Sequence, residues 1–323
     1  MHQIEALLIT GSNGFVGRSF LKFLETLPEN DLPLQIGIVS RTQKFPEIRR
    51  LELKTKVLFI TSDLEQPWEI SFPATHIAHF AADGSVNAYS VDASQKFLEI
   101  TRNLEKWCLG LECPTIFLAS SGACFSQNSS NGKVHLLQKG INNTSNGIKI
   151  SNEKAPLIQS RLQAEESLLL RESSGAIDLR IGRLFSFIGN SLYNKSQYAV
   201  NSFVNMALSS SEIQVLGDPG TVRSYLSEYD MASWIYKSLC QKIDSKYLSI
   251  GSANPVTILE LANEVSAQTG AIVRLPKSFE PGDIYVANSV ETQKLLNVNE
   301  TISWQNALER YITFSREIQK NAR

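Results

Sequence analysis

A glycine-rich stretch near the start of the chain, TGSNGFVG at 10–17, constrains the fold more than any other feature. It directly follows an apolar run at 6–10, and a helical pattern begins inside it. A dinucleotide pyrophosphate needs this order, because glycines let the backbone approach and a helix N-terminus offers free N–H groups and a positive dipole end. A glycine turn without a ligand is the alternative, and the flanking strand and helix favour nucleotide binding. The expected cofactor-binding residues of the turn are Gly11, Ser12, Asn13, Gly14, Phe15, Val16 and Gly17.

Short apolar runs alternate with longer helical patterns through the first half of the chain. Runs without polar alternation indicate strands buried on both faces, as in a parallel sheet covered by helices. The sequence therefore predicts an α/β fold, a Rossmann-type doubly wound parallel sheet. The expected strands cover 6–10, 34–40, 56–61, 76–82, 115–121 and 176–184, and the expected helices cover about 15–27, 92–110 and 157–172.

After residue 185 the elements become shorter, which predicts a smaller α+β lobe interleaved with the first domain. We expect the Rossmann-type domain to cover 1–185 plus part of 220–255, and the substrate-binding lobe to cover most of 186–323. A segment at about 126–154, rich in Ser, Asn and Gly, is predicted to be a long loop. The second half should hold helices near 198–210, 229–241, 257–268 and 303–320, strands at 213–217 and 247–251, and an extended stretch at 223–227.

Composition excludes several classes of function. The net charge of −1 gives no electrostatic reason to expect nucleic acid or an anionic membrane as a partner. The apolar run at the start is too short to span a bilayer and lacks a basic leader, so we expect a cytoplasmic protein. The four cysteines show no metal-ligand spacing, which predicts reduced thiols and no metal site.

The second strand ends in IVSRT, which bears on the choice of cofactor. An NAD site usually has Asp or Glu here, because a carboxylate accepts hydrogen bonds from the ribose 2′-hydroxyl. This chain has Ser40 and Arg41 instead, and a hydroxyl beside a cation suits a 2′-phosphate. A solvated arginine at a strand end is the alternative. The pattern favours NADP(H) over NAD(H).

Two further strand ends carry expected cofactor contacts. Asp63 and Leu64 follow the third strand, where an acid and a backbone N–H could hold an adenine edge. Phe80, Ala81 and Ala82 end the fourth strand, and small residues there let a cofactor pass close to the backbone. Both sites lie at the carboxyl ends of predicted parallel strands, where ligands of such sheets bind.

The motifs together resemble the extended branch of the short-chain dehydrogenase/reductase superfamily, the NAD(P)-dependent sugar-nucleotide epimerases, dehydratases and reductases. The resemblance covers nearly the whole chain. It implies an epimerase or reductase that acts on a nucleotide-activated sugar in surface-polysaccharide or deoxysugar synthesis, and a homodimer formed through a four-helix interface. Besides the glycine turn, it rests on HFAADGS, FLASSGACF, RLFSFIGNSLY, GDPGTVRSYLSEYDMASWIY and YLSIGSANPVTILELANEV.

The resemblance also implies three catalytic positions. The family's Ser or Thr, which binds the sugar oxygen, falls on Ser121. Its proton-transferring tyrosine falls on Leu157 and its lysine on Arg161, so the YxxxK motif is degenerate. Leucine cannot transfer a proton, whereas arginine can still contact ribose hydroxyls but is a poor proton relay. Three readings stay open: an active enzyme with another proton donor; a catalytically attenuated member that binds dinucleotide or sugar nucleotide as a sensor or partner subunit; or an atypical member with different chemistry or an interaction role such as nucleic-acid binding, against which the near-neutral charge argues.

Further site residues follow from the same resemblance. The dehydratases carry an Asp–Glu pair, or at least a Glu, after the active-site Thr, and Gly122 and Ala123 stand there in this chain, which disfavours elimination chemistry. Arg223 matches the position that commonly holds a sugar-nucleotide diphosphate, and an arginine fork suits a phosphate. Leu184 is an expected cofactor contact. The expected substrate-binding residues are Ser121, Gly122, Asn190, Tyr193, Asn201, Phe203 and Arg223.

Overall fold

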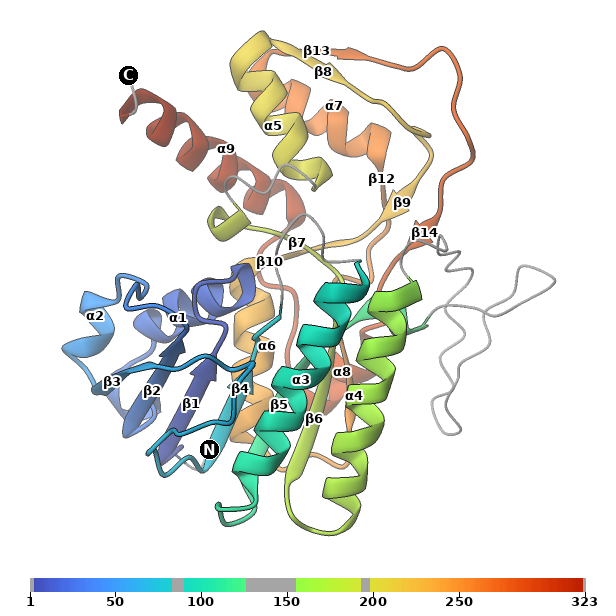
Figure 1. Cartoon of the computed structure of the whole chain (residues 1–323). Helices are drawn as coiled ribbons and strands as arrows, with labels where there is room; N and C mark the ends of the chain where they lie inside the picture. The colour runs from blue at the N-terminus through green and yellow to red at the C-terminus, as the bar shows by residue number, and fades with distance from the viewer. Residues whose placement is uncertain (1–2, 83–89, 126–154, 193–197, 322–323) are drawn as a thin grey trace.

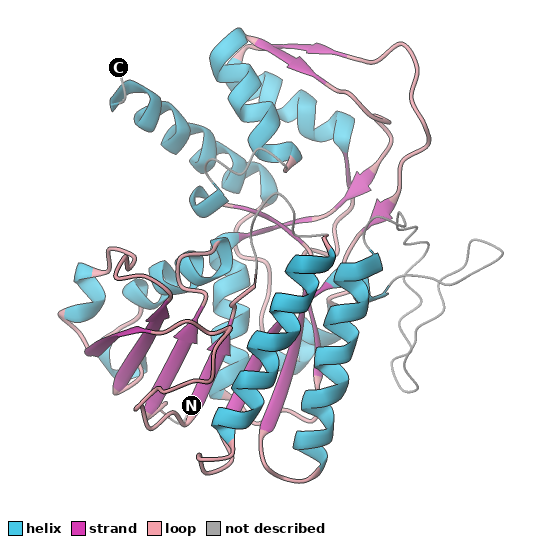
Figure 2. Ribbon diagram, in the orientation of Figure 1, coloured by secondary structure: helices cyan, strands magenta, loops and turns pink. Residues whose placement is uncertain are grey.

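A computed structural model of the chain describes residues 3–82, 90–125, 155–192 and 198–321. A layered α/β lobe and a second lobe of helices and short strands make up these residues (Figure 1). The second lobe stands beyond the carboxyl ends of the strands of the first (Figure 2). In the described ranges, none of the helices has the length and apolar character needed to cross a membrane.

The first lobe is built on seven parallel strands in the order β11-β6-β5-β4-β1-β2-β3. This order confirms the predicted doubly wound sheet. From β1 the chain adds β2 and β3 toward one side of the sheet, and from β4 it adds β5 and β6 toward the other side. Ligands of such sheets bind outside the carboxyl ends of the strands at this change of order, between β1 and β4. The strands are β1 (Ala6–Thr10), β2 (Gln35–Ser40), β3 (Lys56–Thr61), β4 (His76–His79), β5 (Thr115–Ser121), β6 (Asp178–Leu184) and β11 (Tyr247–Ile250).

Helices cover both faces of this sheet. On one face α1 (Phe15–Thr26) packs against α6 (Glu228–Cys240), with the short α2 (Arg49–Glu52) beside α1 and α8 (Val290–Leu296) beside α6. On the other face α3 (Val91–Cys108) and α4 (Ala155–Ser173) lie side by side (Figure 2). The central strands are covered on both faces, so an apolar run such as β1 is buried on both sides, whereas the edge strand β3 keeps exposed residues such as Phe59, which is 43% exposed.

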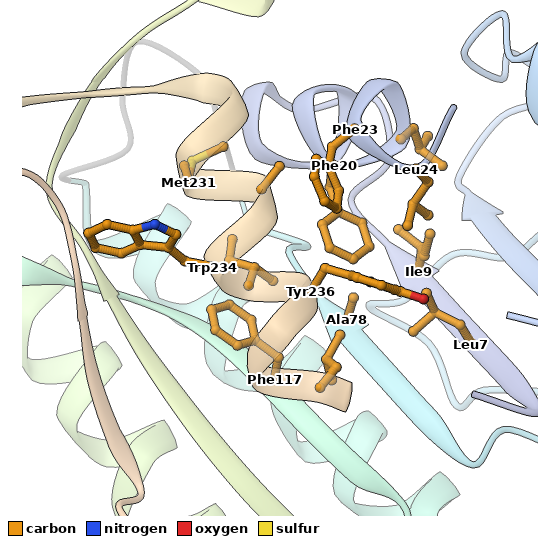
Figure 3. Close-up of a cluster of buried hydrophobic side chains, with 14 of the residues drawn as sticks. Leu7, Ile9, Phe20, Phe23, Leu24, Ala78, Phe117, Met231, Trp234 and Tyr236 are labelled. Carbon is orange, nitrogen blue, oxygen red and sulfur yellow. The ribbon is translucent and has the colours of Figure 1, made fainter. Parts of the chain in front are cut away.

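The strand β1 contributes side chains to two hydrophobic clusters, one on each face of the sheet. Leu7 and Ile9 point toward α1 and α6, where they meet a cluster that includes Phe20 and Tyr236 (Figure 3). Leu8 belongs to the other cluster, under α3 and α4. Each of these leucine and isoleucine side chains is fully buried, which stabilises the fold by about 1.5–3 kcal/mol per side chain.

The second lobe has its own hydrophobic cluster, formed mainly by three helices. These are α5 (Ala199–Ser210), α7 (Ile258–Thr269) and α9 (Trp304–Asn321). The predicted strand at 213–217 is instead β8 (Glu212–Gln214), which pairs with β13 (Ile272–Arg274). The division of the chain near residue 185 into two domains stays a prediction.

Short strands connect the two lobes, and here the structure departs from the sequence prediction. The expected extended stretch 223–227 divides into two strands that pair with different partners. Ser224 is buried between them, and its hydroxyl accepts the Ala287 N–H at 3.3 Å. Strands of two or three residues carry too few positions for a periodic pattern, so the sequence does not predict the connecting strands. The connecting strands are β7 (Ser186–Ile188), which pairs with β10 (Tyr225–Ser227), and β9 (Val222–Arg223), which pairs with β12 (Val256–Thr257) and β14 (Ile284–Tyr285).

Candidate active site at the carboxyl edge of the sheet

The glycine turn between β1 and α1 is shaped by two close backbone contacts. Gly11 has a φ of +68°, and a Cβ there would lie 2.5 Å from the carbonyl carbon of Phe80. A Cβ on Gly17 would lie 2.3 Å from the Gly11 carbonyl oxygen. Gly14 is different, because its Cβ would meet only the Gly11 oxygen, at 3.2 Å. It is the N-cap of α1 and no side chain caps that turn, so its missing side chain leaves the helix N-terminus open.

A pocket of about 420 Å³ opens beside this turn. Most of the expected cofactor contacts meet in it, although they come from four separate strand ends. The residues that the sequence did not predict come from the strand ends and from α3. The predicted lining residues are Gly11, Ser12, Asn13, Gly14, Ser40, Arg41, Asp63, Leu64, Ala81 and Ala82, and the others are Val39, Thr42, Glu65, Lys96 and Ile100.

Ser40 is held within the wall of this pocket. Its hydroxyl donates to the Lys44 carbonyl at 3.0 Å and accepts from Asn13 Nδ2 at 3.1 Å. Asn13 also donates to the Lys44 carbonyl, at 2.9 Å. Both hydrogen bonds hold Ser40 in the pocket wall, and the neighbouring Arg41 is the exposed cation that could contact a 2′-phosphate. Its exposed guanidinium lies 3.7 Å from a carboxylate oxygen of Glu65.

The remaining expected cofactor contacts lie outside the lining of that pocket. Phe80 is buried in the core beside Phe117, with ring centroids 6.1 Å apart. Phe15 packs on Phe187, with ring centroids 5.9 Å apart. Val16 and Leu184 pack against the cluster under α1 and α6. Phe15 and Val16 lie in the first turn of α1, so their backbone N–H groups can still face a phosphate.

Ser121 ends β5 and begins a tight turn, residues 121–125, here called the serine turn. Its hydroxyl oxygen accepts the Ala123 N–H at 3.2 Å, which fixes the side chain at the carboxyl edge of the sheet. The neighbouring Ser120 points the other way, into the protein, where it donates to Glu165. Successive side chains of a strand point to opposite faces, so Ser120 is bonded inside the protein while Ser121 lies at the carboxyl edge of the sheet.

A buried ion pair between Glu165 and Arg183 contacts the serine turn from the interior of the protein. Their side chains are 1% and 3% exposed, and two hydrogen bonds of 3.2 and 2.6 Å join guanidinium and carboxylate. Arg183 also lies over the Phe125 ring, 4.4 Å from its centroid. Burial and the nearby Glu165 carboxylate raise the pKa of the Cys124 thiol to about 11, so this cysteine is neutral at pH 7.

The helix α4 supplies the two positions at which the resemblance implies tyrosine and lysine. Leu157 is half-buried in its first turn, and its carbonyl accepts the Ser160 hydroxyl. Arg161 stacks on Phe97 of α3, with Cζ 3.3 Å from the ring centroid. Its Nη1 is buried and has no hydrogen-bond partner among the described residues. Burial lowers the pKa of Arg161 to about 10, which leaves it charged at pH 7.

His79 ends β4 and is buried, close enough to Arg161 to feel its charge. Its Nδ1 is 2.9 Å from the Thr10 hydroxyl, and its Nε2 is buried without a partner among the described residues. Burial and, to a smaller extent, the positive charge of Arg161 lower the pKa of His79 to about 3. The ring is therefore neutral at physiological pH and is a poor general acid there.

The depressed pKa of His79 predicts acid sensitivity of the fold. Between pH 6.5 and about 3 the unfolded chain binds a proton at this residue and the folded chain does not, so stability is present above pH 6.5 and is lost as pH falls. We expect the free energy of unfolding to fall by about 2 kcal/mol between pH 7 and pH 5. Urea unfolding at both pH values measures it. His79→Asn should remove this part of the decrease, and an unchanged decrease would contradict the assignment.

The expected substrate residues are less closely grouped. Arg223 is engaged with Asp283 at 2.6 Å and donates to the carbonyls of Val222 and Asp283, yet both charged side chains stay 23% exposed. Asn190 begins a short turn, and its backbone N–H donates to Glu228 at 2.8 Å. Tyr193 lies outside the described residues.

Asn201 and Phe203 differ from the expectation. Asn201 is fully buried. Its amide oxygen accepts the Tyr311 hydroxyl, and its amide nitrogen donates to the Leu192 carbonyl. Phe203 is 5% exposed in the hydrophobic cluster of the second lobe. Both are buried on α5, so the structure gives them a packing role instead of contact with a ligand.

Tyr285 was not predicted, and the structure brings it to the serine turn from β14. Its hydroxyl donates to the Leu184 carbonyl at 3.2 Å. A Cβ on Gly122 would lie 2.7 Å from that hydroxyl oxygen. Nothing in the sequence indicates this position, because Tyr285 lies about 160 residues after the serine turn in a two-residue strand.

Comparison with protein families gives a match over most of the chain. Residues 7–251 match the model described as "NAD dependent epimerase/dehydratase family". A curated relative, UDP-N-acetyl-alpha-D-glucosaminuronate decarboxylase of Bacillus cytotoxicus, is 23% identical over 168 residues. That alignment covers 49% of this chain and 52% of the relative, so it spans about half the length of each.

Solved structures share the fold across nearly the whole chain. UDP-glucose 4-epimerase of Thermotoga maritima superposes with a TM-score of 0.76 at 17% identity, covering 97% of this chain and 99% of its own. UDP-glucuronic acid 4-epimerase of Bacillus cereus, solved with NAD and a fluorinated UDP-glucuronic acid, gives 0.75 at 19% identity over 97% and 99%. dTDP-glucose 4,6-dehydratase of Streptomyces venezuelae, solved with NAD, gives 0.75 at 18% identity over 97% and 98%.

Proposed function

The chain belongs to the NAD dependent epimerase/dehydratase family, and from this premise we propose that it is an enzyme that transfers a hydride between a nicotinamide dinucleotide and a carbon of a nucleotide-linked sugar. The observation that carries the proposal is the pocket beside the glycine turn, in which residues from four strand ends meet next to an open helix N-terminus. The proposed setting is the cytoplasmic synthesis of surface polysaccharide or deoxysugars. The buried free thiols of Cys108 and Cys124 suit a reducing compartment.

The described residues fit a dinucleotide. The first turn of α1 beside Gly14 would bind the pyrophosphate, and Asp63 with the Leu64 backbone would hold the adenine. The buried, unpartnered Nη1 of Arg161 is a donor for a ribose hydroxyl. When bound, the nicotinamide supplies a two-electron hydride acceptor or donor.

On the substrate side, Ser121 would hydrogen-bond and polarise the sugar oxygen, since its side chain is fixed at the edge of the sheet. Arg223 is the proposed diphosphate contact, on condition that a phosphate competes with Asp283 for the exposed part of the guanidinium. Gly122 and Ala123 bring no acid to the turn, which favours an epimerase or reductase over a dehydratase.

A second candidate function is supported by Leu157. With no hydroxyl there, the protein could bind dinucleotide or sugar nucleotide as a sensor or partner subunit without turnover. Titration with NADPH and NADH, followed by nicotinamide fluorescence, tests the cofactor site. Incubation with UDP-glucose, UDP-glucuronic acid and dTDP-glucose, followed by chromatography of the products, separates the candidates: turnover supports the enzyme, and binding without turnover supports the second function.

We also propose a homodimer through α3 and α4. These helices lie side by side on one face of the sheet, and each carries one large apolar side chain that is well exposed in the single chain. Val91 of α3 is 61% exposed and Leu170 of α4 is 70% exposed. Burial of such side chains in a four-helix contact would be favourable, and light scattering measures the assembly.

Arg41 gives the test of cofactor preference. We expect Arg41→Ala to weaken NADPH binding by about 10- to 100-fold, because the variant loses a charge-assisted contact to the 2′-phosphate. NADH binding should change by less than about twofold, since NADH has no such phosphate. Fluorescence titration of both cofactors measures the ratio. Lys44→Ala, which removes a cation from the same loop without touching the pocket lining, is the matched control; an unchanged ratio in Arg41→Ala would refute NADP(H) preference.

A further inference from the structure

We propose that Tyr285 supplies the proton-transfer hydroxyl of this site and acts on the sugar oxygen held by Ser121. The proposal rests on the proposed function and concerns the group that Leu157 lacks. The Tyr285 hydroxyl donates to the carbonyl of Leu184, and Leu184 is the direct neighbour of Ser121 in the register of β5 and β6. The phenol therefore lies at the same edge of the sheet as the serine.

Gly122 is the residue that admits this phenol. Its Cβ would lie 2.7 Å from the Tyr285 oxygen and 2.8 Å from the ring of Phe185, so any side chain at 122 would displace them. The dehydratases that the chain resembles have an acidic residue at this turn. Here position 122 has no side chain, and a tyrosine from β14 brings an ionisable hydroxyl to the same place.

The position of β14 connects the phenol to the proposed diphosphate contact. Tyr285 is paired with Arg223 in the parallel register of β9 and β14. A sugar nucleotide with its diphosphate at Arg223 and its sugar oxygen at Ser121 has to pass this strand pair. Phe185 packs on the Tyr285 ring with centroids 4.9 Å apart, which restricts the ring and directs its hydroxyl to the serine turn.

Tyr285 would transfer a proton in both directions of the reaction. When a keto-sugar is reduced, its carbon gains a hydride from the bound nicotinamide, the C=O bond becomes C–O–H, and the Tyr285 O–H bond breaks to give its proton to that oxygen. Water then reprotonates the phenolate. In oxidation the phenolate takes the sugar hydroxyl proton while the carbon gives a hydride, which carries two electrons, to the nicotinamide. Ser121 only binds the oxygen, because its own pKa is too high to hold the charge.

Tyr285→Phe tests the proposal because it keeps the ring and removes the hydroxyl. With the UDP- or dTDP-hexose that the wild type converts, we expect kcat to fall about 100-fold or more and KM to change by less than about threefold. Calorimetric affinity for the same sugar nucleotide should also stay within about threefold. Tyr225→Phe is the matched control, since Tyr225 is a buried tyrosine of the same lobe whose hydroxyl has no partner among the described residues; its kcat should match that of the wild type.

A second variant separates proton transfer from positioning. Incorporation of 3,5-difluorotyrosine at position 285 lowers the phenol pKa, so the basic limb of the kcat–pH profile should move to lower pH. A limb that does not move, or a Tyr285→Phe variant with wild-type kcat, overturns the role of Tyr285. Loss of sugar-nucleotide affinity together with kcat would show a binding role and overturns it as well. A wild type that neither binds nor converts UDP-glucose, UDP-glucuronic acid or dTDP-glucose would instead refute the proposed function itself, and the Tyr285 role with it.

Discussion

We expect Glu165→Gln to lower the free energy of unfolding by about 3 kcal/mol or more, because it leaves the buried guanidinium of Arg183 without its counter-ion. The two side chains are almost completely excluded from solvent, so water cannot replace the lost charge. The variant also weakens the bond from Ser120, which directly precedes Ser121. Urea unfolding, monitored by tryptophan fluorescence, measures the loss.

Two further variants make this result specific. The double variant Glu165→Leu with Arg183→Met removes both charges, and should recover most of the lost stability because an apolar pair carries no desolvation penalty. Glu99→Gln breaks a surface pair with Arg102, in which the side chains are 46% and 63% exposed, and should change stability by less than about 1 kcal/mol. A loss of less than about 1 kcal/mol in Glu165→Gln would show that water or another group solvates Arg183.

The sheet and the glycine-turn pocket could be predicted because their signals are local. Several strands of the sheet are apolar runs such as 6–10, and a strand buried on both faces needs that pattern. The pocket collects strand ends, and parallel topology brings their carboxyl ends to one edge wherever they lie in the chain. Ser40 and Arg41 could therefore be placed beside Gly14 from the sequence alone.

The substrate side could not be predicted in the same way, because its contacts join residues far apart in short elements. Arg223 meets Asp283 across sixty residues, and only the pairing of β9 with β14 brings them together. Asn201 was expected to face a ligand, but a polar residue on a helix can equally be buried if the fold supplies a partner, as Tyr311 does here. Ser40 shows the same limit, since its bond to Lys44 depends on the path of a loop.

The two roles of glycine in the turn after β1 can be separated by substitution. We expect Gly11→Ala to destabilise the protein by about 3 kcal/mol or more, because alanine is disfavoured at a φ of +68° and its Cβ would lie 2.5 Å from the Phe80 backbone. Gly11 directly follows β1 and Phe80 directly follows β4, and these two strands pair with each other. Neither residue can therefore move without disturbing that pairing. Thermal unfolding, or failure of the variant to accumulate as soluble protein, measures this effect.

Gly14→Ala is the matched variant that reports on binding instead of folding. Its φ of −73° is open to alanine, and its Cβ would meet only one backbone oxygen, at 3.2 Å, so the loss of stability should stay within about 1 kcal/mol. The added methyl group would cover the first turn of α1, where a pyrophosphate has to approach the backbone N–H groups, and affinity for NADPH and NADH should fall at least tenfold. Equal affinity in Gly14→Ala and the wild type would mean that the open helix end does not bind the cofactor. In that case the glycines of this turn would serve the packing of α1 on the sheet alone.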